Sequence, residues 1–187
     1  MYKHFFKRLL DFTIALVALI CLSPIILIVT IWLHFANKGA GAFFTQERPG
    51  KDAKIFRVIK FKTMTDERDA DGKLLPDAQR LTKVGRIVRS TSLDELPQLV
   101  NILRGEMSFV GPRPDVPGYA DQLQGDDRKV LKLRPGITGP ATLKYRLEDE
   151  MISEYVAKKQ AEGDTRPMQE IATEYNDNVI YPDKVRL

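Results

Sequence analysis

The stretch SLDELPQLVNILRGEMSFVGPRP, residues 92–114, places two adjacent carboxylates, Asp94 and Glu95, just before a segment with helical apolar periodicity. The apolar positions of that segment share one helix face: Leu96, Leu99, Val100 and Leu103. A turn rich in glycine and proline follows and holds out the guanidinium of Arg113. Carboxylates, a fixed base and a helix N-terminus together suit metal-assisted phosphate chemistry. The stretch therefore predicts a helix whose start carries a phosphate-handling site.

The start of this helix can be placed in two ways. Ser92 and Glu95 match a capping box, which would explain Glu95 without any chemistry. In that register Pro97 would forfeit a hydrogen bond, whereas a start at Asp94 puts Pro97 in the first turn, where a missing N–H costs little. An aspartate cap stabilises a helix by about 1 kcal/mol and needs no catalytic role. The acidic pair alone therefore leaves a structural and a catalytic role open.

Basic side chains that suit phosphate oxygens occur in five segments of the chain: Lys60, Lys62, Arg86, Arg89, Arg113 and Arg134. Arg113 and Arg134 stand in the stiff turns GPRP and RPGITGP, which hold an arginine fork in a fixed position. Any one of the six would also be unremarkable as a solvated surface residue. We therefore expect them to form a binding site for the substrate phosphates only if the fold brings them together.

The composition allows one domain of ordinary size and a membrane anchor in 187 residues. The formal net charge is +4, a mild excess that suits an anionic partner but also fits a plain basic domain. Nucleic-acid binding is disfavoured, because the basic residues are scattered and are not interleaved with aromatic ones. The single cysteine, Cys21, excludes a disulfide within the chain and fits a reducing compartment.

Residues 12–35 contain no Asp, Glu, Lys or Arg. As one helix they would measure about 36 Å, enough to cross a hydrocarbon core of about 30 Å. Ser23-Pro24 lies at the middle, where proline deletes a backbone hydrogen bond and a serine hydroxyl can bond back to a freed carbonyl. Basic residues flank both ends, so the positive-inside rule draws both toward the cytoplasm. We expect a re-entrant helix-break-helix, with a kinked single-pass anchor as the alternative.

The remaining pattern predicts an α+β fold that is mostly helical. Residues 42–48 and 54–61 are strand-like and flank a Pro-Gly turn, so they predict a β-hairpin. Residues 65–80 are interpreted as a charged excursion loop, and residues 81–89 and 147–155 as helices. We expect the chain to divide into a re-entrant membrane helix, residues 1–37, and a small cytoplasmic catalytic domain, residues 38–187, with interfacial amphipathic helices.

These motifs closely resemble those of the monotopic phosphoglycosyl transferases, also called the bacterial sugar transferase family. The resemblance covers roughly residues 1–145 and runs in the family's order through Lys7-Arg8, Asp11, Ser23-Pro24, TQERPG, KFKTM, SLDELPQ, GPRP and RPGITG. SLDELPQ joined to GPRP at this spacing is its most specific part.

The resemblance implies transfer of a sugar 1-phosphate from a UDP-sugar to a polyprenyl phosphate such as undecaprenyl phosphate, with release of UMP, as the first membrane step of polysaccharide assembly. It implies that Asp94 is the nucleophile of a covalent phosphosugar intermediate and a ligand of Mg²⁺, and that Glu95 assists. It also implies a re-entrant helix bent at Ser23 and Pro24, on the cytoplasmic face of the bacterial inner membrane. The expected partners are the UDP-sugar, the lipid phosphate and the bilayer, and a homodimer is a further candidate.

Two other functions stay open on the sequence: a membrane-anchored scaffold, and a one-step transferase in which Asp94 only holds the metal. The chain also departs from the family's pattern in two places. After RPGITG it reads PATLKY at residues 140–145, so the motif leaves the sugar unassigned. Family members usually carry a further amphipathic segment with an aspartate beyond the point where this sequence stops.

Overall fold

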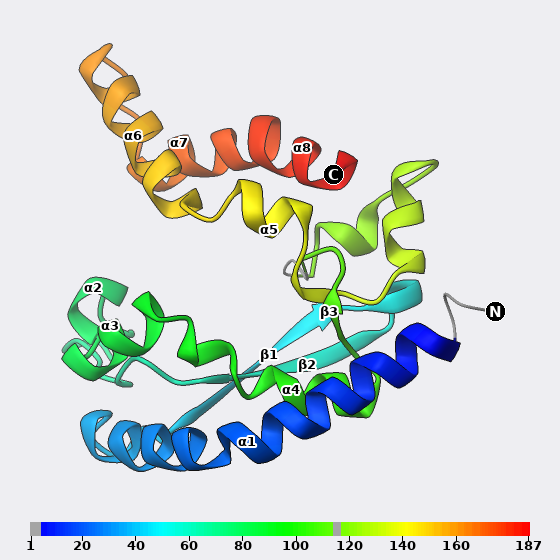
Figure 1. The fold of residues 1–187 in the computed structure, drawn as a ribbon. Coiled ribbons are helices and arrows are strands. Elements are labelled where there is room, and N and C mark those ends of the chain that lie inside the picture. Colours follow the sequence, from blue (N-terminus) through cyan, green and yellow to red (C-terminus); the bar gives the residue numbers. More distant parts are fainter. Residues whose placement is uncertain (1–4, 114–116) are drawn as a thin grey trace.

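The longest element is helix α1, Lys7–Ala36, which runs along one side of the molecule (Figure 1). The computed structural model describes residues 5–113 and 117–187, so Pro114 of the GPRP motif lies outside the described residues. Pro24 is inside α1, and the helix continues across it without interruption. The Ser23 hydroxyl donates to the carbonyl of Ile20 at 2.7 Å, which is the acceptor that the missing N–H of Pro24 would have used. The predicted break is therefore a proline accommodated within one helix.

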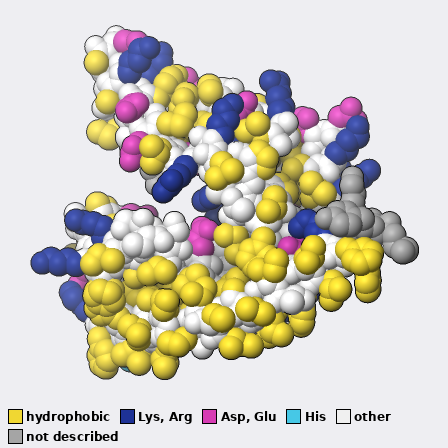
Figure 2. Space-filling view, in the orientation of Figure 1, with side chains coloured by type: hydrophobic (Ala, Val, Ile, Leu, Met, Phe, Trp, Pro, Cys, Tyr) yellow, Lys and Arg dark blue, Asp and Glu magenta, His cyan; other side chains and the backbone are white. Residues whose placement is uncertain are grey.

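One face of α1 packs on the rest of the protein and the other is bare. Ala15 belongs to a buried cluster with Phe56 and Ile102, and Leu33 belongs to a second cluster with Val88. Figure 2 shows a broad apolar surface along the opposite face of this helix. The helix is long and apolar enough to cross a membrane by length and composition. Whether it spans or re-enters stays a prediction.

A polar cluster fastens the first turns of α1 to the following domain. The buried Asp11 carboxylate accepts hydrogen bonds from Ser108 Oγ at 2.9 Å and from Lys7 Nζ at 3.1 Å. Arg8 donates to the carbonyls of Ile102 and Leu103, at 2.5 and 2.7 Å. These two carbonyls belong to the end of helix α4, Gln98–Arg104, where carbonyl groups lack helical partners. Helix α1 is thus bonded directly to the helix that follows the acidic pair.

The predicted hairpin is confirmed. Strand β1, Phe43–Pro49, pairs antiparallel with strand β2, Ile55–Phe61, through the short turn η2, Lys51–Ala53. Phe43 lies opposite Phe61, and their rings stack with centroids 5.2 Å apart. The side chain of the buried Asn101 fixes α4 to β2, because it accepts from the N–H of Ile59 and donates to the carbonyl of Arg57.

The charged loop after β2 is anchored at both of its ends. It contains α2, Asp77–Arg80, and leads into α3, Lys83–Ser90, close to the helix expected at 81–89. The N–H of Thr65 donates to the carbonyl of Arg80 at 3.0 Å. Gly85 packs so tightly on the same segment that a Cβ there would lie 2.0 Å from the carbonyl oxygen of Thr63. The loop base therefore occupies a fixed position.

The acidic pair lies in a different local structure from the one expected. Ser92 adopts a left-handed conformation with φ 56°, and a 3₁₀ turn, η3, covers Leu93–Glu95 before α4 begins at Gln98. Neither Ser92 nor Asp94 caps α4. The Ser92 side chain makes no capping hydrogen bond, and Asp94 lies inside turn η3, four residues before α4 begins. Pro97 directly precedes α4, where its lack of an N–H costs nothing. Both predicted starts of the helix were therefore wrong. The 3₁₀ turn leaves the carboxylates of Asp94 and Glu95 available for other partners.

The chain then forms a small parallel sheet and a helical arm. Strand β3, Ser108–Val110, pairs with β4, Gly136–Thr138, and between them lie η4, Ala120–Gln122, and η5, Asp127–Lys132. The arm consists of α5, Pro140–Lys144, α6, Glu148–Ala161, α7, Met168–Tyr175, η6, Asn176–Ile180, and α8, Tyr181–Arg186.

The arm lies across the molecule from α1 (Figure 1). The rings of Tyr155 and Tyr175 stack at 4.2 Å and join α6 to α7. The structure is thus the mostly helical α+β fold that the sequence predicts, with α6 extending beyond the expected 147–155. An interfacial position for any of its helices stays a prediction.

Candidate active site

The acidic pair opens onto a cavity of about 660 Å³, within the size range of ligand pockets. Four regions contribute its walls: the hairpin, the charged loop, helix α3 with turn η3, and the turn that carries Arg113. The lining residues are Phe44, Gln46, Lys60, Phe61, Lys62, Thr63, Met64, Asp66, Leu74, Asp77, Arg80, Arg89, Ser92, Asp94, Glu95 and Arg113. Figure 2 shows the molecule hollowed between the arm and the part that contains α2 and α3, with acidic side chains at the back.

Glu95 is paired, and Asp94 is not. Lys60 Nζ, near the end of strand β2, lies 3.0 Å from Glu95 Oε1, with 29% and 24% of the two side chains exposed. Asp94 forms no ion pair with any residue that the structure describes. Burial raises the pKa of Asp94 above its ordinary value, and the positive charge of Lys60 lowers that pKa in part. The negative charge of Glu95 raises the pKa further, and the positive charge of Arg89 lowers it. A cation beside Asp94 would therefore relieve the unfavourable burial of its charge.

The structure brings four of the six predicted basic residues to the cavity. Lys60, Lys62, Arg89 and Arg113 line it, and Arg113 and Arg89 make no hydrogen bond or ion pair with the described residues. Arg86 is exposed on α3 and does not line the cavity. Arg134 instead donates through Nε to the carbonyl of Gly105 at 2.8 Å, just past the end of α4. Its turn thus has a structural use, because it satisfies a carbonyl that follows the helix.

Sequence reasoning missed Arg80, which also lines the cavity. Its Nη2 donates to Asp77 at 2.7 Å, its Nη1 to the carbonyl of Thr65 at 3.3 Å, and its buried Nε has no partner among the described residues. The available signal was the Asp77–Arg80 spacing of three, which suits one helical turn. In a loop without apolar periodicity that signal was too weak to use.

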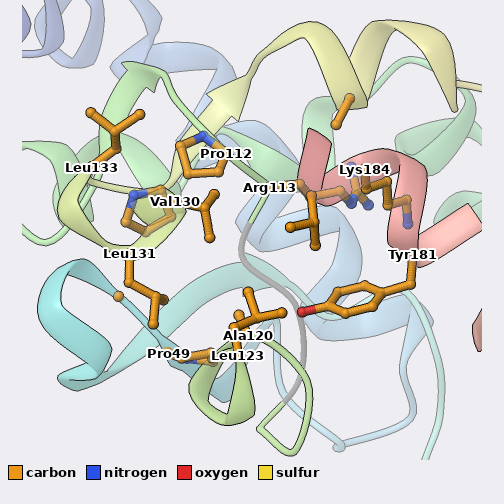
Figure 3. Close-up of a pocket in the computed structure, with 14 residues that line it drawn as sticks. Pro49, Pro112, Arg113, Ala120, Leu123, Val130, Leu131, Leu133, Tyr181 and Lys184 are labelled. Atoms are coloured by element: carbon orange, nitrogen blue, oxygen red, sulfur yellow. The ribbon is translucent and has the colours of Figure 1, made fainter. Parts of the chain in front are cut away.

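A second, much smaller pocket adjoins the first through Arg113. Figure 3 shows its apolar wall, including Leu131 and Val130, with Arg113 and Lys184 along one side. Its volume of about 40 Å³ is far below the roughly 300–1,000 Å³ of typical ligand pockets. We therefore place the candidate chemistry in the larger cavity.

The donor set at Asp94 fits a magnesium ion bound together with substrate. Among residues 5–113 and 117–187 no three His, Cys, Asp or Glu side chains form a metal cluster. Mg²⁺, however, commonly takes one or two carboxylates and completes its octahedron with water and substrate phosphate oxygens. Asp94 offers an unpaired carboxylate for this purpose, whereas Glu95 is already engaged by Lys60.

Comparison with known proteins places the chain in a family. Residues 2–180 match the family model described as bacterial sugar transferase. The chain is 49% identical over 140 residues to the uncharacterised sugar transferase EpsL of Bacillus subtilis, covering 75% of this chain and 69% of EpsL. It is 41% identical over 144 residues to the UDP-glucose:undecaprenyl-phosphate glucose-1-phosphate transferase of Klebsiella pneumoniae, covering 74% of this chain and 30% of that enzyme.

A third relative is the undecaprenyl-phosphate galactose phosphotransferase of Salmonella typhimurium, 37% identical over 155 residues, which cover 73% of this chain and 32% of that protein. The chain thus spans about a third of the length of each of these two enzymes, the Klebsiella and the Salmonella relative. The family model nevertheless covers nearly the whole sequence, and EpsL matches over most of its own length. The chain belongs to the bacterial sugar transferase family.

Proposed function

We propose that this protein transfers a sugar 1-phosphate from a UDP-sugar to undecaprenyl or another polyprenyl phosphate, and so starts the assembly of a glycan on a lipid carrier. The names of the Klebsiella and Salmonella relatives support the lipid acceptor, and the Klebsiella name also supports the nucleotide donor. The observation that carries the proposal is the half-buried carboxylate of Asp94, which forms no ion pair within the described part of the chain, in a cavity shared with Lys60, Arg89 and Arg113.

The reaction is proposed to proceed in two displacements at one phosphorus atom. An Asp94 carboxylate oxygen attacks the phosphorus next to the sugar; the new O–P bond forms as the bond to UMP breaks, and UMP leaves with that electron pair. An oxygen of the lipid phosphate then attacks the same phosphorus and releases the Asp94 carboxylate. A covalent intermediate divides one difficult transfer into two easier steps, and it lets UMP leave before the lipid phosphate enters.

Charge is the main obstacle, because a carboxylate must approach an anionic diphosphate. Arg89 and Arg113 face the same cavity, have no partner among the residues that the structure describes, and can neutralise phosphate oxygens. Lys60 holds Glu95 in place, so Glu95 can accept or return a proton at the edge of the site while Asp94 attacks. Bound at Asp94, Mg²⁺ would supply further neutralisation of the phosphate charge.

The membrane side of the proposal rests on α1. Its bare apolar face would sit in the bilayer, and the bonds from Asp11 and Arg8 would hold the cavity next to the lipid headgroups. We propose a re-entrant helix that leaves both of its ends on the cytoplasmic face of the inner membrane, since basic residues flank both ends. The polyprenyl phosphate would then present its phosphate at the level of the cavity.

The test is Asp94→Asn in the full chain in membranes, supplied with UDP-sugars and undecaprenyl phosphate. We expect UMP release to fall at least a thousandfold while membrane association is unchanged, because asparagine cannot form the acyl phosphate. Retained turnover would refute the nucleophile. The wild-type protein, incubated with labelled donor but without lipid, should carry the sugar phosphate covalently. Turnover without any trapped label would instead favour the one-step transferase, and absence of turnover with every donor would favour a scaffold.

A further inference from the structure

The wall of the cavity formed by the charged loop is built differently from the part around Asp94. It carries two ion pairs: Lys62 Nζ lies 2.5 Å from Asp66 Oδ2, and Arg80 Nη2 lies 2.7 Å from Asp77 Oδ1. All four of these residues line the cavity. We propose that this wall, which we call the loop wall, binds the hydroxyl groups of the donor's hexose. The inference rests on the proposed function, because it assigns the sugar end of the same substrate.

The distribution of charge orients the donor. Around Asp94 the cations Lys60, Arg89 and Arg113 outnumber the two carboxylates, which suits a diphosphate. On the loop wall two cations balance two carboxylates, so a phosphate placed there would meet an anion for every cation. A neutral group rich in hydroxyls suits such a wall, since carboxylates accept from hydroxyls and a guanidinium donates to them. The hexose therefore points toward the loop, away from Arg113.

The ion pairs leave hydrogen-bonding capacity for a ligand. Asp66 and Asp77 each contact their cation through one carboxylate oxygen, and their side chains are 53% and 75% exposed. The Arg80 side chain is only 13% exposed, and its Nε has no partner among the described residues. Phe44 and Leu74 add half-exposed apolar surface to the same cavity, against which the C–H face of a sugar ring can lie. Polar groups beside an apolar platform match both surfaces of a pyranose.

The loop wall is also held at a fixed distance from the reacting carboxylates. Lys60 and Lys62 are two residues apart on an extended segment, so their side chains leave the same face. One of them binds Glu95 and the other binds Asp66. The loop base is anchored by the Thr65–Arg80 backbone hydrogen bond and by the close contact of Gly85 with Thr63. A wall so placed can select among hexoses, because a hydroxyl with the wrong configuration would leave its partners unpaired.

Vicinal hydroxyls also occur on the ribose of the nucleotide, so the experiment separates the two sources. Dissociation constants for UDP, UDP-glucose and UDP-galactose are measured with the full chain in nanodiscs, for the wild type and for Asp77→Asn and Asp66→Asn. The control is Lys73→Gln, an exposed residue of the same loop that does not line the cavity. Thermal melting of each variant shows whether it is folded.

We expect Asp77→Asn and Asp66→Asn to weaken binding of at least one UDP-hexose about tenfold, and to change the affinity for UDP less than twofold. A tenfold loss corresponds to about 1.4 kcal/mol, close to the lower end of the range of about 1.5–3 kcal/mol for one hydrogen bond to a charged group. Equal weakening of UDP and UDP-hexose would overturn the hexose assignment in favour of the nucleotide. Unchanged affinity for all three ligands would overturn the loop wall as a binding surface.

These measurements need no turnover, so the two proposals can fail separately. Hexose-dependent binding without UMP release would leave the loop wall standing and refute the transferase proposal. Normal UMP release, together with variants whose donor affinity and donor preference match those of the wild type, would support the transferase proposal and refute the loop wall.

Discussion

The ammonium of Lys60, near the end of strand β2, lies 3.0 Å from the carboxylate of Glu95 in the turn before α4. This contact joins the two segments that carry the site, and it accounts for Glu95 without a helix cap. Glu95 and its neighbour Asp94 thereby differ in environment, since Glu95 is paired with Lys60 and Asp94 forms no ion pair with a residue that the structure describes. Two adjacent acids in different environments can take different roles in one reaction.

We expect Glu95→Gln to reduce UMP release at least a hundredfold, in the range of lost general acid–base catalysis. The unfolding free energy should change by less than about 1 kcal/mol, because a partly exposed ion pair contributes little. Turnover and thermal unfolding are measured on the same preparations. The matched control is Glu47→Gln, which breaks the exposed Glu47–Arg57 pair on the hairpin and should leave both properties unaltered. A variant that loses stability but keeps its turnover would show that Glu95 is only structural.

We expect Pro24→Ala to change the topology of α1. Alanine restores the N–H that can donate to the Ile20 carbonyl, so the serine bond is no longer needed and a straighter helix becomes favourable. Cysteines placed at the two ends of α1 in a Cys21→Ser background are labelled from each side of the membrane. The wild type should label from one side only, and some Pro24→Ala chains from both. Ile25→Ala serves as the control, and identical labelling of all three proteins would remove the role assigned to Pro24.

Gly85→Ala tests the anchoring of the charged loop. The added Cβ would lie 2.0 Å from the Thr63 carbonyl oxygen, so α3 and the loop base must move apart. Overpacking of this kind typically costs about 1–3 kcal/mol, and we expect weakened UDP-hexose binding as well as a lower melting temperature. Ser90→Ala on the same helix should change stability by no more than about 0.5 kcal/mol. A Gly85→Ala protein with wild-type melting and donor affinity would contradict the fixed loop base.

The arm should show acid-dependent stability. Hydrogen bonds from Arg166 lower the pKa of Asp164 from 3.8 to about 2. A carboxyl whose pKa is depressed by folding stabilises the native state above its unfolded pKa, and this contribution is lost as the pH falls through the native value. Melting temperatures between pH 4 and pH 2 should therefore fall more steeply for the wild type than for Asp164→Asn. Parallel curves of melting temperature against pH for the two proteins would show that the Asp164–Arg166 contact does not contribute to the stability of the native state.

The sequence predicts the hairpin, the long apolar helix and the location of the acidic pair, because each depends on local periodicity or on a specific motif. The cap at Asp94 or Ser92 was wrong because Ser92 is left-handed, a conformation that no pattern around it signals. The positions of Arg89 and Arg134 depend on tertiary packing: Arg89 faces the cavity, while Arg134 donates a hydrogen bond to the carbonyl of Gly105.

Arg80 and the arm, apart from the helix expected at 147–155, were beyond sequence reasoning for a related reason. The loop that carries Arg80 has no apolar period, and its position follows from backbone contacts with Thr65 and from the space left by Gly85. The arm is polar along most of its length and is joined by the Tyr155–Tyr175 stack. Long-range contacts of this kind leave no regular spacing in the sequence.

Arg8 bonds to the last carbonyls of α4, and the turn that directly precedes α4 holds Asp94. If α1 lies in lipid as proposed, a displacement of the helix along the membrane normal would move Asp94, the proposed nucleophile, by a similar amount. On the proposed function, bilayer thickness would therefore influence the reaction rate: in thicker or thinner membranes the fold would persist, while the Asp94 carboxylate would lie at a different height relative to the phosphates of the lipid acceptor.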